Sequence, residues 1–227
     1  MSLTTSPLSF LRRCACSGVI ALTMVGGVTA VSAFDSALVA AADSGLPVNA
    51  LAPEITASAE AAVAALDAYV ESGSVADERT LAFFRGTAAR YAARELGYDE
   101  LAMVDAWSTT TLAHQRAVLA ALTQVGVPYR TNTSIEGEGF DCSGLTTYAW
   151  QGSGYDLFRQ SGSQISQAKA VSRDEAKAGD LVHYPGHVMM YLGVGDAIVH
   201  SIQTGRTVEV DEFRRGSVSF GDPTLSD

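Results

Sequence analysis

The sequence is poor in cysteine, in basic residues and in aromatic side chains. Its 227 residues include three Cys, 15 Lys and Arg against 25 Asp and Glu, and 8% aromatic residues. The acidic balance argues against a nucleic-acid partner, because no basic stripe is present to neutralise phosphates. The cysteines have no metal-like spacing to histidine, which excludes a zinc framework. Hydrophobic residues still make up 47% of the chain, so the sequence predicts one or two folded domains.

Residues 1–33 have the pattern of a secretory signal peptide. Arg12 and Arg13 precede a short apolar stretch, and small residues follow up to Ala33. A basic segment, an apolar core and a small-residue end are the features of such a peptide. The stretch is short and rich in Gly and Thr for a membrane span. We expect cleavage after Ala33, with residues 40–42 as a second choice, and a secreted or cell-wall protein without a membrane anchor. An uncleaved signal anchor is the alternative.

This cleavage would leave one cysteine in the exported protein. Cys14 and Cys16 would be removed with the signal peptide, so Cys142 would have no internal disulfide partner. A lone exported thiol is either reactive, paired with another molecule, or a small buried hydrophobic residue. Its sequence neighbours decide between these alternatives.

The remaining chain divides into an alanine-rich half and a glycine-rich half. Residues 34–53 are expected to form a linker, and residues 54–110 a helical region with helices over 54–71 and 77–96. A further helix is expected to end at Val125. The helical region is interpreted as a spacer, a partner-binding arm, a lid over a functional site, or helices that only pack on residues 111–227.

The second half carries the periodicity of short strands. Residues 181–184, 187–192, 197–202 and 207–210 are rich in β-branched and apolar side chains and are separated by Gly-containing turns. Consecutive hairpins of this kind predict an antiparallel meander. With helices supplied from upstream, the predicted fold class is α+β rather than a doubly wound parallel sheet.

Asp141 and Cys142 stand at the start of a predicted helix that runs into Leu145, Tyr148 and Ala149. Asp is a preferred N-cap residue, so Asp141 is expected to place Cys142 in the first helical turn. Unpaired N–H groups and partial positive charge at that position favour a thiolate. The same N–H groups are suited to hold a developing oxyanion. The pattern therefore favours a reactive thiol, which needs a base.

Two histidines of the predicted hairpin can supply that base. Two of three plausible turn registers place His187 and His200 on one face of the sheet. One of these centres the turn between Val194 and Gly195 and makes the two histidines diagonal neighbours. A thiol nucleophile requires a general base and a residue that orients it. Cys142, His187 and His200 can fill these roles in that order.

The same three residues could instead bind a metal ion. They lack an obvious fourth ligand, and a closed metal site has no need of a cysteine at a helix N-terminus. We therefore expect neither a metal nor an organic cofactor. No role is assigned to His114 or His183.

Six segments of the second half form a recognisable series. They are Gly126-Val127-Pro128-Tyr129, Phe140-Asp141-Cys142-Ser143-Gly144-Leu145, Arg159-Gln160-Ser161-Gly162-Ser163-Gln164, Ala178-Gly179-Asp180-Leu181-Val182, His187-Val188-Met189-Met190-Tyr191-Leu192-Gly193 and Ile198-Val199-His200-Ser201. In this order they resemble the NlpC-type family of bacterial cell-wall cysteine peptidases, which have a papain-like fold. The resemblance covers roughly residues 116–213, and Ala178 replaces the family's usual Pro.

The resemblance implies roles for individual residues. Cys142 corresponds to the nucleophile, His187 to the general base and acid, and His200 to the third polar residue of the site. The residues implied to line the site and to assist with the oxyanion or the free amine of the substrate are Tyr129, Asp141 and Ser143.

The resemblance also implies a substrate. Family members cleave peptidoglycan stem peptides, typically at the γ-D-glutamyl bond to the diamino acid, through an acyl-thioester. Residues 130–133 depart from the Trp-Gly-Gly that is common after this tyrosine in relatives. The alternatives are a non-catalytic wall-binding protein and an amidase or acyltransferase with the same Cys-His site. We expect a monomer, with residues 54–110 as a self-inhibitory lid.

Overall fold

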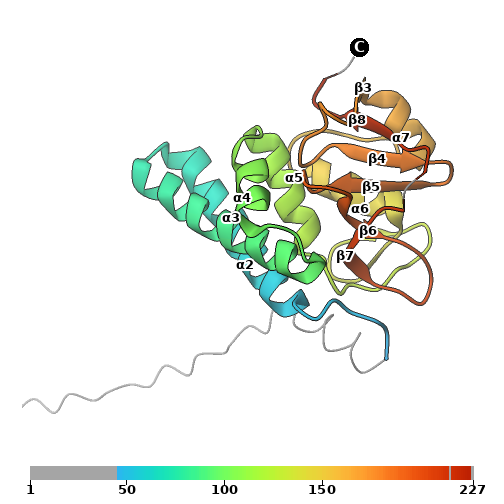
Figure 1. The fold of residues 1–227 in the computed structure, drawn as a ribbon, viewed down its shortest axis with the longest axis horizontal. Helices are drawn as coiled ribbons and strands as arrows, with labels where there is room; N and C mark the ends of the chain where they lie inside the picture. Colours follow the sequence, from blue (N-terminus) through green and yellow to red (C-terminus); the bar gives the residue numbers. More distant parts are fainter. Residues whose placement is uncertain (1–44, 215, 226–227) are drawn as a thin grey trace, which may run out of the picture. The chain divides into compact units, whose positions relative to one another are not determined.

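The computed structural model describes residues 45–214 and 216–225. The predicted signal peptide, its cleavage sites and most of the predicted linker lie outside these residues. The described part contains helices packed beside and across an antiparallel sheet (Figure 1). The predicted α+β class, with a helical region before a strand meander, is confirmed. No helix within the described ranges combines the length and apolar character needed to span a bilayer.

Six helices are described. Those before the sheet are α2 (Ala52–Ser72), α3 (Val75–Leu96), α4 (Glu100–Ser108) and α5 (Leu112–Leu122), and those beside it are α6 (Cys142–Gln151) and α7 (Ser161–Gln167). The predicted helices over 54–71 and 77–96 correspond to α2 and α3. The helix expected to end at Val125 is α5, which ends three residues earlier. Helix α4 was not predicted, because its nine residues bury only Met103 and Trp107 and carry little periodicity.

Helices α2 and α3 form an antiparallel hairpin. Gly73 ends α2 with a positive φ of 61°, and Ser74 caps α3 by accepting a hydrogen bond from the N–H of Asp77. Glycine adopts this backbone conformation without strain, and serine is a preferred N-cap. The buried side chains of the two helices are mostly alanine, which lets their backbones approach closely; they include Ala59, Ala62, Ala65, Ala88, Ala89, Ala92 and Ala93.

The main sheet has six antiparallel strands in the order β3-β8-β4-β5-β6-β7. Its strands are β3 (Lys169–Val171), β4 (Leu181–Tyr184), β5 (His187–Tyr191), β6 (Ala197–Ser201), β7 (Val208–Glu212) and β8 (Ser219–Asp222), and β1 (Ser134–Ile135) pairs with β2 (Gly139–Phe140) separately. The predicted meander is β4 to β7. Strands β3 and β8 extend it at the β4 edge, where β8 pairs with both β3 and β4.

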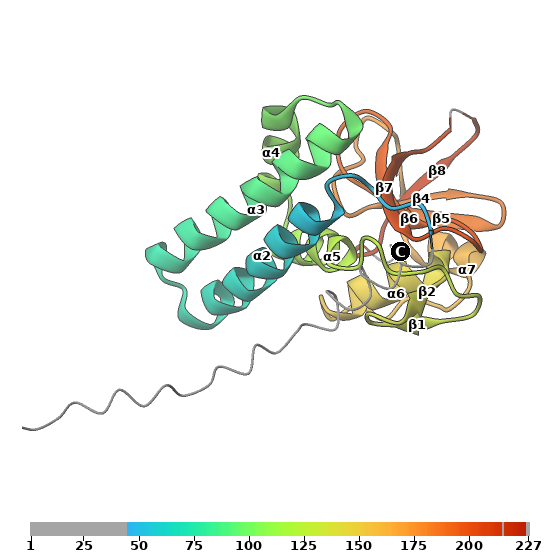
Figure 2. The same cartoon turned by 90° about the horizontal axis from the view of Figure 1, so that it is seen from below.

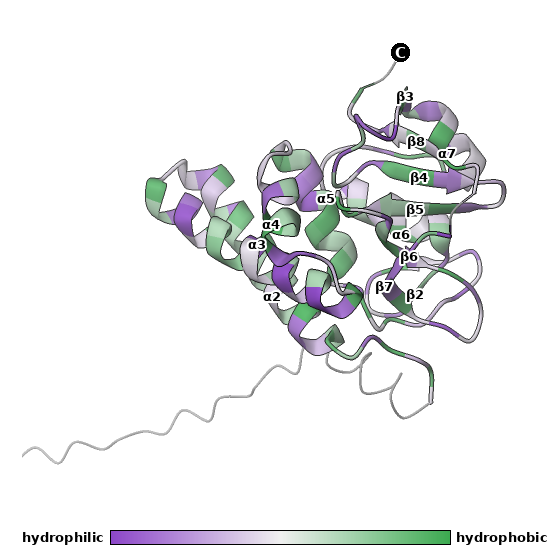
Figure 3. Ribbon diagram, in the orientation of Figure 1, coloured by the Kyte–Doolittle hydropathy of each residue, from purple (hydrophilic) through white to green (hydrophobic). Residues whose placement is uncertain are grey.

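The two faces of the sheet lie in separate hydrophobic clusters. Alternate residues such as Met190 and Val199 belong to the large cluster that includes α2, α5 and α6. Their neighbours Met189 and Ile198 belong to a smaller cluster with Phe220. Hydrophobic residues are dense along α5 and the central strands (Figure 3). The sheet is therefore buried on both sides, and the site side chains stand near its β5–β6 region.

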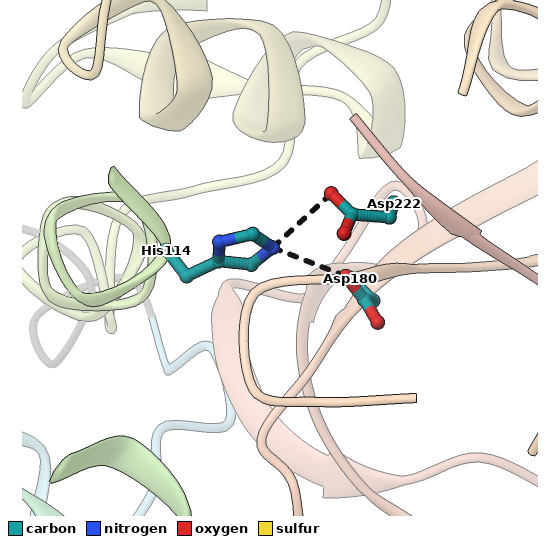
Figure 4. Close-up of side chains that lie close together, drawn as sticks. All are labelled: His114, Asp180 and Asp222. Carbon is teal, nitrogen blue, oxygen red and sulfur yellow. Dashed lines mark hydrogen bonds and ion pairs between the residues drawn. The ribbon is translucent and has the colours of Figure 1, made fainter. Parts of the chain in front are cut away.

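A buried cluster of charged side chains joins α5 to the start of β4 and the end of β8. His114 Nε2 lies 3.2 Å from Oδ1 of Asp180 and 3.3 Å from Oδ1 of Asp222 (Figure 4). Lys177 pairs with the other oxygen of Asp222. The backbone N–H and hydroxyl of Thr224 also donate to Asp222. His114, which was assigned no role from the sequence, therefore connects three elements of the fold.

The segment before α2 and the helical region are bonded to the sheet. The residues preceding α2 run beside β7, where Asn49 exchanges two hydrogen bonds with the backbone of Val210 (Figure 2). Trp107 Nε1 donates to the carbonyl oxygen of Leu192, and the hydroxyl of Tyr98 accepts the N–H of Asp196. Two of these bonds meet the ends of the turn between β5 and β6, so the helical region braces that turn.

Candidate active site

Cys142 is the first residue of α6, as predicted. Asp141 is the N-cap, and its Oδ1 accepts the N–H of Gly144 at 2.7 Å. Its Oδ2 accepts the N–H of Asn132, also at 2.7 Å. A Cβ at Gly144 would lie 2.1 Å from the carbonyl oxygen of Thr133, so only glycine fits there. Cys142 is a half-buried free thiol at the positive end of the helix.

Arg159 holds the N-cap from outside the helix. Its two terminal nitrogens donate to the two oxygens of Asp141 at 2.9 and 2.7 Å. One of them also donates to the hydroxyl oxygen of Ser143 at 2.8 Å. The predicted site residues Asp141 and Ser143 therefore form one hydrogen-bond network with Arg159. Arg159 begins the segment 159–164 that resembles the family, but no role for it was predicted from the sequence.

His187 and His200 are hydrogen-bonded to each other, with 3.1 Å between Nε2 of His187 and Nδ1 of His200. In the sheet Met190 pairs with Val199 and Tyr191 with Ile198, so the turn centres between Val194 and Gly195. This confirms the register in which the two histidines are diagonal neighbours. Because Nε2 of His187 is occupied by His200, Nδ1 is the remaining ring nitrogen of His187.

The two imidazoles differ in their protonation. Burial lowers the pKa of His187 to about 3, with further lowering from His200 and His183. Burial also lowers the pKa of His200, but the carboxylates of Asp211 and Glu209 more than offset this effect, so the pKa of His200 is raised. The pair therefore takes its first proton on His200, and His187 remains neutral and able to accept a proton.

An open cavity of about 390 Å³ surrounds the thiol. Gly186, the residue before His187, lies on its wall, and the wall also contains the predicted residue Tyr129. The full lining is Tyr129, Thr131, Asn132, Asp141, Cys142, Ser143, Arg159, Gln160, Ser161, Gly162 and Gly186. Among the described residues, none from α2, α3 or α4 lines this cavity. The self-inhibitory lid stays a prediction.

Two groups of side chains bring three possible metal ligands within 4.8 Å of one another in the described ranges. They are His114, Asp180 and Asp222, and His200, Glu209 and Asp211. In the first group Lys177 already offsets part of the acidic charge, so we interpret it as an ion-pair network. The second group includes a histidine whose other nitrogen holds His187. Cys142 belongs to neither group. The carboxylates of the second group were not identified from the sequence: they alternate along one strand, but only the register with β6 brings them to His200.

Comparisons with known proteins point to one family for this half of the chain. The sequence pattern of the NlpC/P60 family matches residues 126–219. The chain is 36% identical over 94 residues to the gamma-D-glutamyl-L-lysine dipeptidyl-peptidase of Bacillus subtilis, covering 38% of this chain and 31% of that protein. It is 37% identical over 123 residues to peptidoglycan endopeptidase RipB of Mycobacterium tuberculosis, covering 47% and 51%.

Solved structures that are similar to this chain include the P60 domain of the M. avium subspecies paratuberculosis antigen MAP1204. That domain is 30% identical, with a TM-score of 0.43, over 48% of this chain and 93% of the other. The chain spans 31% and 51% of the two curated relatives. The matched segment contains Cys142, His187 and His200. Through residues 126–219, this chain belongs to the NlpC/P60 family.

Proposed function

We propose that this protein is a secreted cysteine endopeptidase that hydrolyses peptidoglycan stem peptides at the bond between γ-D-glutamate and the diamino acid. One observation carries the proposal: a free thiol on a capped helix N-terminus lines the same open cavity as Gly186. Gly186 directly precedes His187, which is neutral and is hydrogen-bonded to His200. The names of the two curated relatives, a γ-D-glutamyl dipeptidyl-peptidase and a peptidoglycan endopeptidase, support the substrate.

Attack by the thiol begins the proposed reaction. Nδ1 of His187 takes the proton of Cys142, and the sulfur forms a bond to the carbonyl carbon of the substrate. The carbonyl oxygen becomes an oxyanion next to the backbone N–H groups of Cys142 and Ser143, since the N–H of Gly144 is already bonded to Asp141. Tyr129 lies on the same cavity wall and is proposed to assist there.

Breakdown of this intermediate releases the amine. The C–N bond breaks while His187 returns the proton to the leaving nitrogen, and an acyl-thioester remains on Cys142. Water then gives a proton to His187 and attacks the thioester carbon. The C–S bond breaks, the carboxylic acid leaves, and the thiolate recovers its proton. Water is the only co-reactant in this sequence of steps.

Asp141, Ser143 and Arg159 are proposed to bind the stem peptide near the thiol. The Asp141 carboxylate faces the cavity and, in the resemblance, helps to hold a free amine. Arg159 offsets its charge but leaves the carboxylate side chain partly exposed, at 13%. A carboxylate in this position favours a substrate with a protonated N-terminus, such as a peptide already separated from its glycan.

Digestion of purified peptidoglycan tests the proposed function. Residues 34–227 and the Cys142→Ala variant are incubated with the polymer and with isolated stem peptides, and the products are identified by mass spectrometry. Cleavage after γ-D-glutamate by the wild-type chain alone is the expected result. Cleavage elsewhere would change the bond, and transfer to an added amine would indicate an acyltransferase. Binding without cleavage of either substrate would favour the wall-binding alternative.

A further inference from the structure

Two carboxylates stand behind His200, on the side away from His187. His200 pairs with Glu209 in the β6–β7 register, and Asp211 follows two residues later on the same face of β7. Nε2 of His200 lies 3.6 Å from Oε1 of Glu209 and 3.7 Å from Oδ2 of Asp211. The Glu209 side chain is 6% exposed and that of Asp211 is 45% exposed. Glu209 is therefore the buried partner.

Within the described chain, Nε2 of His200 and Oε1 of Glu209 are both buried and make no hydrogen bond at this separation. Buried polar atoms without a partner are costly, and native proteins pair nearly all of them. The other oxygen of Glu209 is held by Arg206. Oε1 is thus directed toward the imidazole, and a shortening of about 0.7 Å would complete a normal hydrogen bond.

The direction of this bond matters for the reaction. Each imidazole nitrogen either donates or accepts, and a hydrogen bond at one nitrogen selects the tautomer. A carboxylate only accepts, so it requires the proton of neutral His200 to lie on Nε2. Nδ1 of His200 is then an acceptor and receives the Nε2–H of His187. That leaves Nδ1 of His187 as the lone pair that can take the thiol proton.

We propose that Glu209 is a positioning residue of this site: its buried carboxylate fixes the tautomer of His200, which in turn fixes that of His187. This inference rests on the proposed cysteine-peptidase function. Proton transfer is confined to Cys142, His187, water and the substrate. Arg206 holds the other oxygen of Glu209 and so orients its carboxylate, while Asp211 lies on the more exposed side of His200.

Glu209→Gln is a sharp test because the variant has nearly the same shape. Arg206 donates to the carboxylate, so in the variant it holds the single amide oxygen and turns the NH₂ group toward His200. An NH₂ group donates, which places the proton of His200 on Nδ1 and reverses the bond to His187. We expect kcat to fall about 10²-fold with an unchanged KM. Glu175→Gln is the matched control and should leave kcat unchanged, since this carboxylate is exposed and bonds to Ser172 away from the cavity.

¹⁵N NMR of the histidine-labelled, substrate-free protein gives a readout independent of activity. The spectrum is recorded above the pH at which His200 titrates, because only a neutral imidazole has a single protonated nitrogen. His187, Glu209 and Asp211 all face that ring and influence its titration. Wild type and Glu175→Gln should show a protonated Nε2 on His200, and Glu209→Gln a protonated Nδ1. The same tautomer in all three proteins would overturn the inference, as would full kcat in Glu209→Gln. If peptidoglycan is not cleaved but the tautomers differ as expected, the proposed function fails and the positioning role stands.

Discussion

Arg159 and Asp141 form a two-pronged ion pair, with one guanidinium nitrogen on each carboxylate oxygen at 2.9 and 2.7 Å. Such pairs fix orientation as well as charge. Because Asp141 is also the N-cap of α6, the arginine controls where the helix begins and thus where the thiol of Cys142 points. The pair connects the segment before α7 to the first turn of α6.

Arg159→Met should remove this constraint. We expect kcat/KM to fall about 30-fold, as for other groups that orient a site residue. Without Arg159, the Asp141 carboxylate loses the partner that fixes its orientation and offsets its charge at the start of α6. Arg94→Met, which breaks an exposed ion pair with Glu100, is the control. It should leave kcat/KM unchanged, since surface pairs contribute little. Equal rates for both variants on isolated stem peptides would contradict the role given to Arg159.

The acidic limb of the pH profile should report the protonation of His200. The proposed mechanism requires neutral His200, whose pKa is raised because the carboxylates of Asp211 and Glu209 outweigh burial. Removing one of those charges lowers that pKa. Asp211→Asn should therefore reach its full kcat/KM at a lower pH than wild type, with the same plateau. A limb that stays in place, or moves to higher pH, in a rate profile would contradict this assignment.

Asp222→Asn should destabilise the fold without touching the thiol site. The Asp222 side chain is 1% exposed and faces His114 and Lys177. Breaking a buried ion pair from one side costs about 3 kcal/mol. Asp67→Asn, at an exposed pair with Arg116, is the control and should cost less than about 1 kcal/mol. Urea unfolding monitored by fluorescence measures both values, and equal free energies of unfolding would contradict the prediction.

The same carboxylate gives a pH dependence of stability. Burial raises the pKa of Asp222, but the combined effect of Lys177, Thr224 and His114 lowers it by more, so the net shift of the pKa is downward. A depressed pKa contributes stability above the unfolded-state value, about 3.9 for aspartate, and this contribution is lost as pH falls through the folded-state value. Wild type should therefore lose its advantage over Asp222→Asn below about pH 4. A constant difference between the two proteins down to acid unfolding would count against it.

Gly144→Ala should disturb the first turn of α6. The added methyl group would overlap the carbonyl oxygen of Thr133, which is backbone and cannot turn away. We expect a loss of about 3 kcal/mol in the free energy of unfolding, at the upper end for overpacking, and a large loss of activity. Gly152→Ala, at the C-cap of the same helix, is the matched control, because the nearest neighbour of its added methyl group would lie at an ordinary 3.6 Å. Similar melting temperatures for the two variants would refute the steric argument.

The sequence was most informative where local chemistry determines the structure. The Asp141 cap and the helix start at Cys142 follow from N-cap preference. The alternation in residues 187–202 left three possible hairpin registers, and the observed register is one of them. Strand β8 was missed because Gly221 and Asp222 are poor strand formers, and its place is set by pairing with distant β3 and β4. Such long-range pairing leaves little local signal.

The supporting residues of the site were harder to find for a related reason. Glu209 and Asp211 look like the solvent-facing side of an edge strand, and only the register with β6 puts them behind His200. Arg159 was visible as part of a segment, but its partners lie 16 and 18 residues away in sequence. Cys142 and His187 could be proposed as nucleophile and base from residue type and sequence position, whereas the residues proposed to orient them depend on tertiary pairing.

The brace between the helical region and the β5–β6 turn affects how interchangeable the two halves are. A Cβ at Gly195 would lie 2.4 Å from the ring of Tyr98, so the turn fits closely under this one helix end. The turn also sets the spacing of His187 and His200. A chimera that joins residues 111–227 to an unrelated N-terminal spacer would lack this surface, so its β5–β6 turn would lose the hydrogen bonds to Trp107 and Tyr98.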